Sequence, residues 1–149
     1  MRAILVLAAT ALLVSCGGAG DSFDPSTLRL AGSWRATVPI SAPDTIPGVR
    51  IPCTTSWIAT FDTTIYSSPD TLYTMIPTST VAICPDRAPQ PYEFRGMSLF
   101  ATQEADSVIL KPWQNPFIRF ASLRVRSSTR LQGPVAPYWF PRGDLILQR

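Results

Sequence analysis

Histidine is absent from all 149 residues, and lysine occurs once, at Lys111. Histidine is the side chain that most often serves as a general base near neutral pH, and it is the commonest protein ligand for metal ions. Its absence argues against many hydrolytic and metal-dependent mechanisms. A nucleophilic serine would have only Lys111 as an activating base, and no spacing around Lys111 supports such a pair.

Acidic side chains are also few, at 10 against 13 basic ones. A carboxylate pair for glycoside hydrolysis could be drawn from Asp62, Glu93, Glu104 and Asp106. Each of these lies in a predicted turn or on the polar face of a predicted strand, where solvated acids are usual. We therefore predict no catalytic residue, no metal site and no cofactor, and a protein that is not an enzyme. The net charge of +3 gives no indication of a nucleic-acid partner.

The apolar run of residues 4–14 is too short for a membrane-spanning helix, which needs about 20 residues. It follows Arg2, which is the arrangement of a secretory signal peptide. The run ends in Leu13-Val14-Ser15-Cys16. This tetrapeptide resembles the lipobox of bacterial lipoproteins. The resemblance implies that the signal peptide is cut before Cys16 and that Cys16 carries a diacylglyceryl group, which makes the membrane a partner.

The resemblance also implies a location. Gly17 follows the cysteine, in place of the aspartate that signals inner-membrane retention in enterobacterial lipoproteins. We therefore expect a lipid-anchored protein of the bacterial cell envelope, at the outer membrane. The expected organisation is a signal peptide at 1–15, the lipidated cysteine and a flexible tether at 16–26, and one β-barrel domain at 27–149. The alternative is an ordinary secretory peptide with an incidental cysteine.

Only Cys53 and Cys84 remain once Cys16 is assigned to the lipid. Export to an oxidising compartment favours a disulfide between them. The alternative is two buried free thiols.

Alternation with a period of two dominates the chain and predicts an all-β fold. Trp34 lies on a run in which even positions are apolar or small and the residues between them are mostly polar. The 15 prolines and the lack of a helical period argue against a helical bundle. About eight short strands separated by turn signals favour a single small antiparallel barrel, with a β-sandwich as the alternative. Phe94 and Phe100 are predicted to share a face, with a bend at Gly96, and residues 41–52 read as a loop.

Gly32 and Trp34 form a Gly-x-Trp pattern that is similar to the signature of lipocalins and of lipocalin-like domains in bacterial lipoproteins. The resemblance implies an eight-stranded barrel whose closed end is plugged by Trp34. A basic residue from near the C-terminus, Arg142 or Arg149, would lie over the tryptophan. The alternative needs no family, because a glycine on a strand can simply make room for a neighbouring core tryptophan.

Two functions remain open. The first is a structural or accessory role in the envelope through contact with another protein. The second is a lipocalin-like carrier of a small apolar ligand, for which a hollow barrel would be lined by Trp34, Phe61, Phe94, Phe100 and Phe120. A cavity of roughly 300 Å³ or more would favour the carrier, whereas a filled core with an apolar outer patch would favour the protein contact.

A basic patch is formed in the sequence by Arg119, Arg124, Arg126 and Arg130. These arginines could contact lipid phosphates on the membrane to which the chain is tied. The alternative is a charged outer face that protects a strand at the edge of the sheet.

Overall fold

The chain folds into antiparallel β-structure. The computed structural model describes residues 23–43, 47–63, 71–137 and 143–149, so the expected signal peptide, Cys16 and Arg142 lie outside the described residues. Ten strands form one sheet in the order β3-β6-β7-β8-β9-β10-β1-β2-β4-β5. The strands are β1 (Gly32–Pro43), β2 (Arg50–Phe61), β3 (Thr71–Ile76), β4 (Ser79–Ile83), β5 (Gln90–Glu93), β6 (Met97–Glu104), β7 (Ser107–Pro112), β8 (Ala121–Ser127), β9 (Arg130–Pro134) and β10 (Asp144–Gln148).

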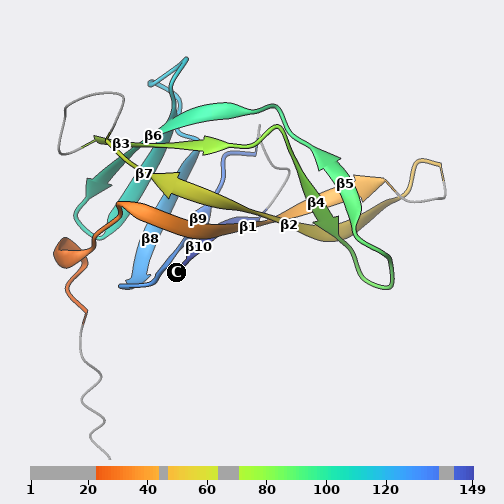
Figure 1. Cartoon of the computed structure of the whole chain (residues 1–149), viewed down its shortest axis with the longest axis horizontal. Coiled ribbons are helices and arrows are strands. Elements are labelled where there is room, and N and C mark those ends of the chain that lie inside the picture. Colours follow the sequence, from red (N-terminus) through yellow and green to blue (C-terminus); the bar gives the residue numbers. More distant parts are fainter. Residues whose placement is uncertain (1–22, 44–46, 64–70, 138–142) are drawn as a thin grey trace, which may run out of the picture.

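Two passes of the chain through the sheet are each divided in two. β3 and β4 follow one another across Pro77, and β5 and β6 follow one another across Gly96. Proline cannot donate to a ladder and glycine weakens a strand, so ten strands form from eight passes. The sheet curls into a half-barrel (Figure 1). An all-β fold is therefore confirmed, whereas the chain does not form the predicted closed barrel of eight strands. A two-sheet sandwich is also wrong, because the described strands belong to one sheet.

The inner face of the curled sheet carries the core. Alternate residues of β1 and β2 are buried, as the period of two predicts, and they pack with apolar side chains from the other strands. The largest fully buried apolar side chains are Trp34, Phe61, Phe120, Leu99, Leu110, Leu123, Leu131, Leu145, Leu147, Val38 and Val108. The region predicted as a loop at 41–52 is shorter than expected, because the β1–β2 ladder includes both Pro43 and Pro52. β1 pairs with β10 only as far as Thr37, and a strand without a second neighbour tolerates proline.

The end of the sheet into which the amino-terminal segment leads is called here the tether end. A short 3-10 helix, η1 (Pro25–Thr27), lies there beside the β6–β7 turn (Figure 1). The Asp24 carboxylate caps η1 by accepting a hydrogen bond of 2.9 Å from the backbone N–H of Ser26. That bond lowers the pKa of Asp24. The amide of Gln103 donates to the Pro25 carbonyl at 2.7 Å, which fixes η1 against β6.

Trp34 of β1 and Arg149, just after β10, are in contact at the tether end. The Arg149 guanidinium carbon lies 4.4 Å from the centre of the Trp34 ring. The indole N–H of Trp34 donates to the Leu30 carbonyl at 2.7 Å, and Arg149 donates to the carbonyls of Leu30 and Ala31. Gly32 has φ +107°, and a Cβ there would lie 3.3 Å from Arg149 Nη2. Of the two basic residues named as candidates, Arg149 thus lies over Trp34, and Arg142 is outside the described residues.

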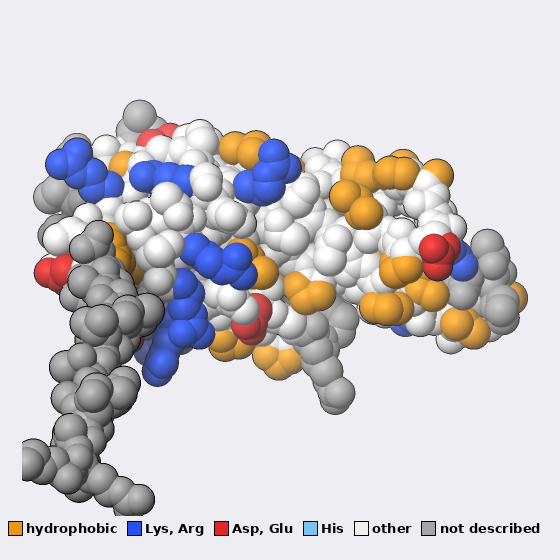
Figure 2. Space-filling view, turned by 90° about the horizontal axis from the view of Figure 1, so that it is seen from below, with side chains coloured by type: hydrophobic (Ala, Val, Ile, Leu, Met, Phe, Trp, Pro, Cys, Tyr) orange, Lys and Arg blue, Asp and Glu red, His pale blue; other side chains and the backbone are white. Residues whose placement is uncertain are grey.

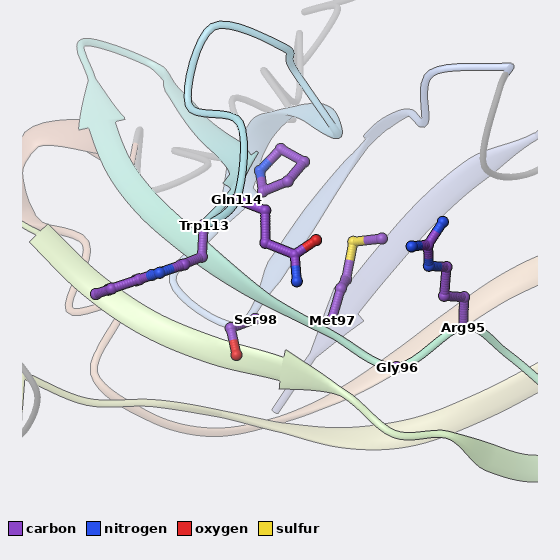
Figure 3. Close-up of a pocket in the computed structure, with 7 residues that line it drawn as sticks. Arg95, Gly96, Met97, Ser98, Trp113 and Gln114 are labelled. Carbon is purple, nitrogen blue, oxygen red and sulfur yellow. The ribbon is translucent and has the colours of Figure 1, made fainter.

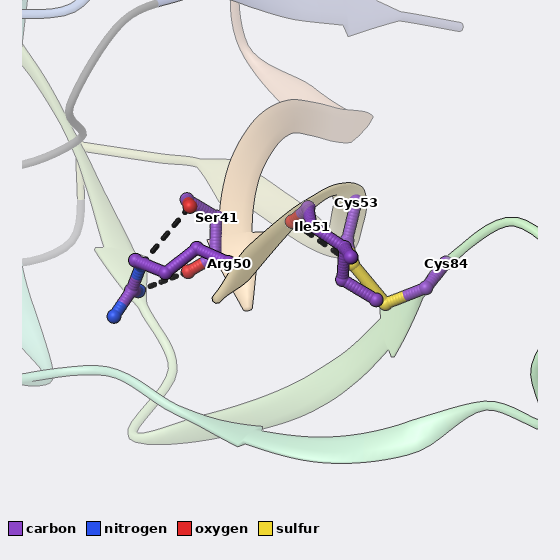
Figure 4. Close-up of a disulfide and its surroundings, with 5 residues drawn as sticks. All are labelled: Ser41, Arg50, Ile51, Cys53 and Cys84. Atoms are coloured by element: carbon purple, nitrogen blue, oxygen red, sulfur yellow. Dashed lines mark hydrogen bonds between the residues drawn. A yellow bond between two sulfur atoms is a disulfide. The ribbon is translucent and has the colours of Figure 1, made fainter. Parts of the chain in front are cut away.

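A disulfide between Cys53 and Cys84 fastens the opposite end, called here the distal end. The S–S distance is 2.04 Å, and both residues are buried (Figure 4). Thr54 pairs with Ile83 at the end of the β2–β4 ladder, so the disulfide continues that ladder by one position. Arg50 also ties the β1–β2 tip, because it donates to the Ser41 hydroxyl at 3.0 Å and to the Ser41 carbonyl.

Candidate functional site

The five aromatic residues proposed to line a ligand cup do not share one space. Trp34, Phe61 and Phe120 are almost fully buried in the core. Phe94 is partly buried and packs edge-on against Trp57, with ring centres 5.6 Å apart. Three of the proposed lining residues are thus part of a filled interior.

Phe100 lies on the outer face of the sheet, away from Phe94. The chain bends at Gly96 between β5 and β6, and this bend shifts the alternation by one residue, so that Leu99 and Ala101 face the core. The predicted bend is present, but the prediction that Phe94 and Phe100 share a face is wrong.

On the outer face, Phe100 pairs with Tyr73 and stacks on Trp113. Its ring centre lies 5.0 Å from each of those rings, and the Phe100 and Trp113 planes differ by 20°. A cavity of about 120 Å³ adjoins this cluster at the distal ends of β6 and β7. The Gln114 amide points between Trp113 and Met97 in this cavity, with Arg95 at its far side (Figure 3). The cavity is smaller than the pockets that usually bury a drug-sized ligand, which begin at about 300 Å³.

A larger opening, called here the β2–β3 slot, lies between β2 and β3. At one end of the slot β2 pairs with β4 over Thr54–Ser56, and at the other end Asp62, just after β2, forms a bridge with Tyr73 of β3. Within the described residues, no ladder pair joins β2 to β3 between these points. The slot has a volume of about 330 Å³ and is lined by Ile58, Thr60, Asp62, Tyr73, Thr74, Met75 and Ser98.

Thr74 gives the slot a polar floor. The residue is 5% exposed, and its hydroxyl oxygen has no hydrogen-bond partner among the described residues. A buried hydroxyl without a partner costs roughly 1–3 kcal/mol. The slot can therefore supply one hydrogen-bonding group to whatever enters it.

Four exposed apolar side chains flank the slot on the outer face, and together they are called here the apolar stripe. They are Ile58 (57% exposed), Met75 (65%), Val81 (47%) and Ile83 (54%). Ile58 of β2 and Met75 of β3 both line the slot. Val81 is paired with Ser56, two residues from Ile58, so Val81 and Ile58 are diagonal neighbours. Ile83 continues the same face of β4 towards the distal end.

One member of the apolar stripe can be recognised in the sequence as an exception to the alternation of polar and apolar residues. Ile58 occupies an outward position between Ser56 and Thr60, where a polar residue is expected. Val81 and Ile83 belong to a run that is apolar at both parities, so their face could not be assigned without the pairing of β4 to β2.

A groove of about 480 Å³ lies at the tether end, between the amino-terminal segment and β6. Its lining is mostly apolar and consists of Leu28, Arg29, Leu30, Ala31, Thr63, Leu72, Ala101 and Gln103.

The described ranges hold no metal-binding cluster and no membrane-spanning helix. No group of three or more histidine, cysteine or acidic residues there could hold a metal ion. No helix within those ranges is long and apolar enough to cross a bilayer.

No family model, no curated protein and no solved structure matches this chain. What the protein does must therefore be inferred from its own surfaces.

Proposed function

We propose that this protein is a lipid-anchored accessory protein of the bacterial cell envelope, held at the outer membrane through Cys16 and acting by contact with another protein. The basis for the anchor is the lipobox-like segment Leu13-Val14-Ser15-Cys16. Two or three acyl chains on Cys16 would hold the domain on the membrane far more firmly than a single chain, because each buried methylene contributes about 0.8 kcal/mol.

The apolar stripe is the observation that carries the contact function. Ile58, Met75, Val81 and Ile83 are each about half exposed, while the inner face of the sheet is filled. Exposed apolar side chains that are grouped together are typical of protein-interaction surfaces. A partner that covered the apolar stripe would remove this surface from water and reach the Thr74 hydroxyl through the β2–β3 slot.

The anchor is tested by mass spectrometry of the protein purified from membranes. We expect a mature chain that begins at Cys16 and carries the mass of a diacylglyceryl group. The same mature chain with Cys16→Ser, exported behind an ordinary cleavable signal peptide, should be found in the soluble fraction. An intact, uncleaved leader on the native protein would contradict the anchor.

The contact function is tested by the size of the native particle in mild detergent. We expect the wild-type protein to migrate with a partner, and the variant I58S/V81S to migrate as a lone chain. The matched control is T37S/T54S, which changes two side chains on the same outer face that do not line the slot and should leave the complex intact. A lone wild-type chain would contradict the function.

A carrier of a small apolar ligand is the second candidate, and the groove at the tether end favours it. At about 480 Å³ this groove is large enough for a small ligand. The contact between Arg149 and Trp34 is one that the lipocalin resemblance implies. A stoichiometric apolar molecule that co-purifies with the protein would favour this candidate over the protein contact.

A further inference from the structure

A basic face covers the outside of four neighbouring strands. In sheet order these are β8, β9, β10 and β1, and they carry Arg124, Arg126, Arg130 and Arg35. The only acid in these four strands is Asp144. Figure 2 shows Lys and Arg side chains spread over the tether half of the molecule, and apolar side chains gathered at the opposite end, where β4 and β5 lie.

The ladder register places these arginines close together. Gln148 of β10 is paired with Arg35 on one side and with Arg130 on the other. Arg35 and Arg130 therefore lie in the same row on either side of β10, about 10 Å from each other in the sheet. Arg124 is paired with Gln132 in the adjacent row. The row of Arg35 and Arg130 lies at the tether end, beside Arg149.

The positive charge of the basic face is not neutralised within the part of the chain that the structure describes. Arg130 donates to the Gln132 amide oxygen at 3.1 Å, and Gln132 donates to Asp144 at 3.0 Å. Asp144 is thus engaged by a neutral amide. Arg35, Arg124 and Arg126 make no ion pair with a described residue.

Protection of a sheet edge does not account for this charge. β8 lies between β7 and β9, and β9 lies between β8 and β10, so both strands are paired on each side. Arg119, grouped with them in the sequence, lies in the β7–β8 connection, outside these four strands, and is not part of the basic face. Unpaired arginines on strands without a free edge require another explanation.

We propose that the basic face lies against the anionic lipid surface of the membrane that holds Cys16, which leaves the apolar stripe free for the partner protein. This inference rests on the proposed lipid anchor. Phe23, the first described residue, comes only seven residues after Cys16. Seven residues span at most about 25 Å, so the domain remains near a surface whose potential extends about 8–10 Å. The short tether thus gives the arginines a high effective concentration of lipid phosphates.

The test uses the mature Cys16→Ser chain, which has no lipid, and measures its binding to vesicles by sedimentation. One vesicle is purely zwitterionic, and the other contains about 30 mol% phosphatidylglycerol. We expect clear binding to the anionic vesicle alone, and loss of that binding at about 0.5 M salt, where charges are screened within a few ångströms. Equal binding to both vesicles would overturn the proposal.

The variant R126S/R130S should bind anionic vesicles about 25-fold more weakly, since each arginine near such a surface contributes about fivefold. The control R95S/R119S makes the same change of net charge with exposed arginines outside the basic face. An equal loss in the control would overturn the proposal, because the interaction would then depend on net charge alone. Formation of the Cys53–Cys84 disulfide in both variants verifies that they fold.

Failure of the anchor and failure of the basic face give different results. A failed anchor appears in the native protein as an unmodified N-terminus. A failed basic face appears in the vesicle assay as binding that R126S/R130S does not change. Tight binding to a soluble anionic polysaccharide without binding to anionic vesicles would also overturn the membrane assignment.

Discussion

The tether end and the distal end of the curled sheet are fastened by different chemistry. At the tether end, the Arg149 guanidinium lies over Trp34 and hydrogen-bonds the segment that precedes it. At the distal end, the Cys53–Cys84 disulfide joins β2 to the chain just after β4. The noncovalent contact stabilises the native state directly, whereas a disulfide acts largely by restricting the unfolded chain.

The difference follows from how the strands are paired. At the tether end β1 lies between β10 and β2, so its backbone is satisfied on both sides. Towards the distal end β1 no longer pairs with β10, and the β1–β2 ladder includes Pro43 and Pro52. A ladder with one free side and prolines is weakly held, and a covalent bond compensates for the missing pairs. Three variants separate the contributions of the two fastenings.

Trp34→Ala should have the largest effect. Trp34 is 1% exposed and lies in the centre of the core at the tether end. Removing a buried tryptophan costs about 3–5 kcal/mol, and the ring under Arg149 is lost as well. Urea denaturation measures the change in the free energy of unfolding. Trp113→Ala, which removes a half-buried tryptophan from the outer face, is the control and should cost less; an equal or larger loss there would show that Trp34 does not organise the tether end.

Replacing both distal cysteines, as Cys53→Ser with Cys84→Ser, should have the next largest effect. The two residues are 31 positions apart, and closing a loop of that length contributes about 3.5 kcal/mol in the chain-entropy treatment. We expect hydrogen exchange to accelerate most in β4 and β5 and little in β9 and β10. A uniform acceleration over the whole sheet would contradict a local role for the disulfide at the distal end.

Arg149→Ala should have the smallest effect of the three, at about 1–2 kcal/mol. It removes a cation–π contact and hydrogen bonds to two carbonyls. Exchange should accelerate at the tether end, in the opposite pattern to that of the cysteine variant. Arg149→Lys keeps the charge but not the planar donor group, so partial rescue is expected. If Arg149→Ala left the stability unchanged, the contact with Trp34 would be incidental.

Much of the β1–β2 hairpin and the core could be predicted from the sequence. The even positions around Trp34 gave the buried face of β1 correctly, because a strand packed on one side must alternate. The disulfide followed from the number of cysteines. In each case the pattern is local, or depends on a count, and needs no knowledge of which strands become neighbours.

The candidate surfaces could not be predicted in the same way, because they depend on pairing between distant strands. Phe100 was placed on the wrong face, since a bend at Gly96 changes the parity of everything after it. Ile58 and Met75 line the same slot because Asp62, just after β2, forms a bridge with Tyr73 of β3. The closed barrel was wrong for a related reason: Pro77 and Gly96 divide two passes, and their effect on the sheet is not local.

Photo-crosslinking at two positions in native envelopes tests most directly whether the two surfaces face different partners. A photoreactive residue is placed at Ile58, on the apolar stripe, and in a second chain at Gln132, on the basic face. We predict a single protein adduct from position 58 and a phospholipid adduct from position 132. Lipid adducts from position 58 with protein adducts from position 132, or the same adducts from both, would contradict the proposed orientation.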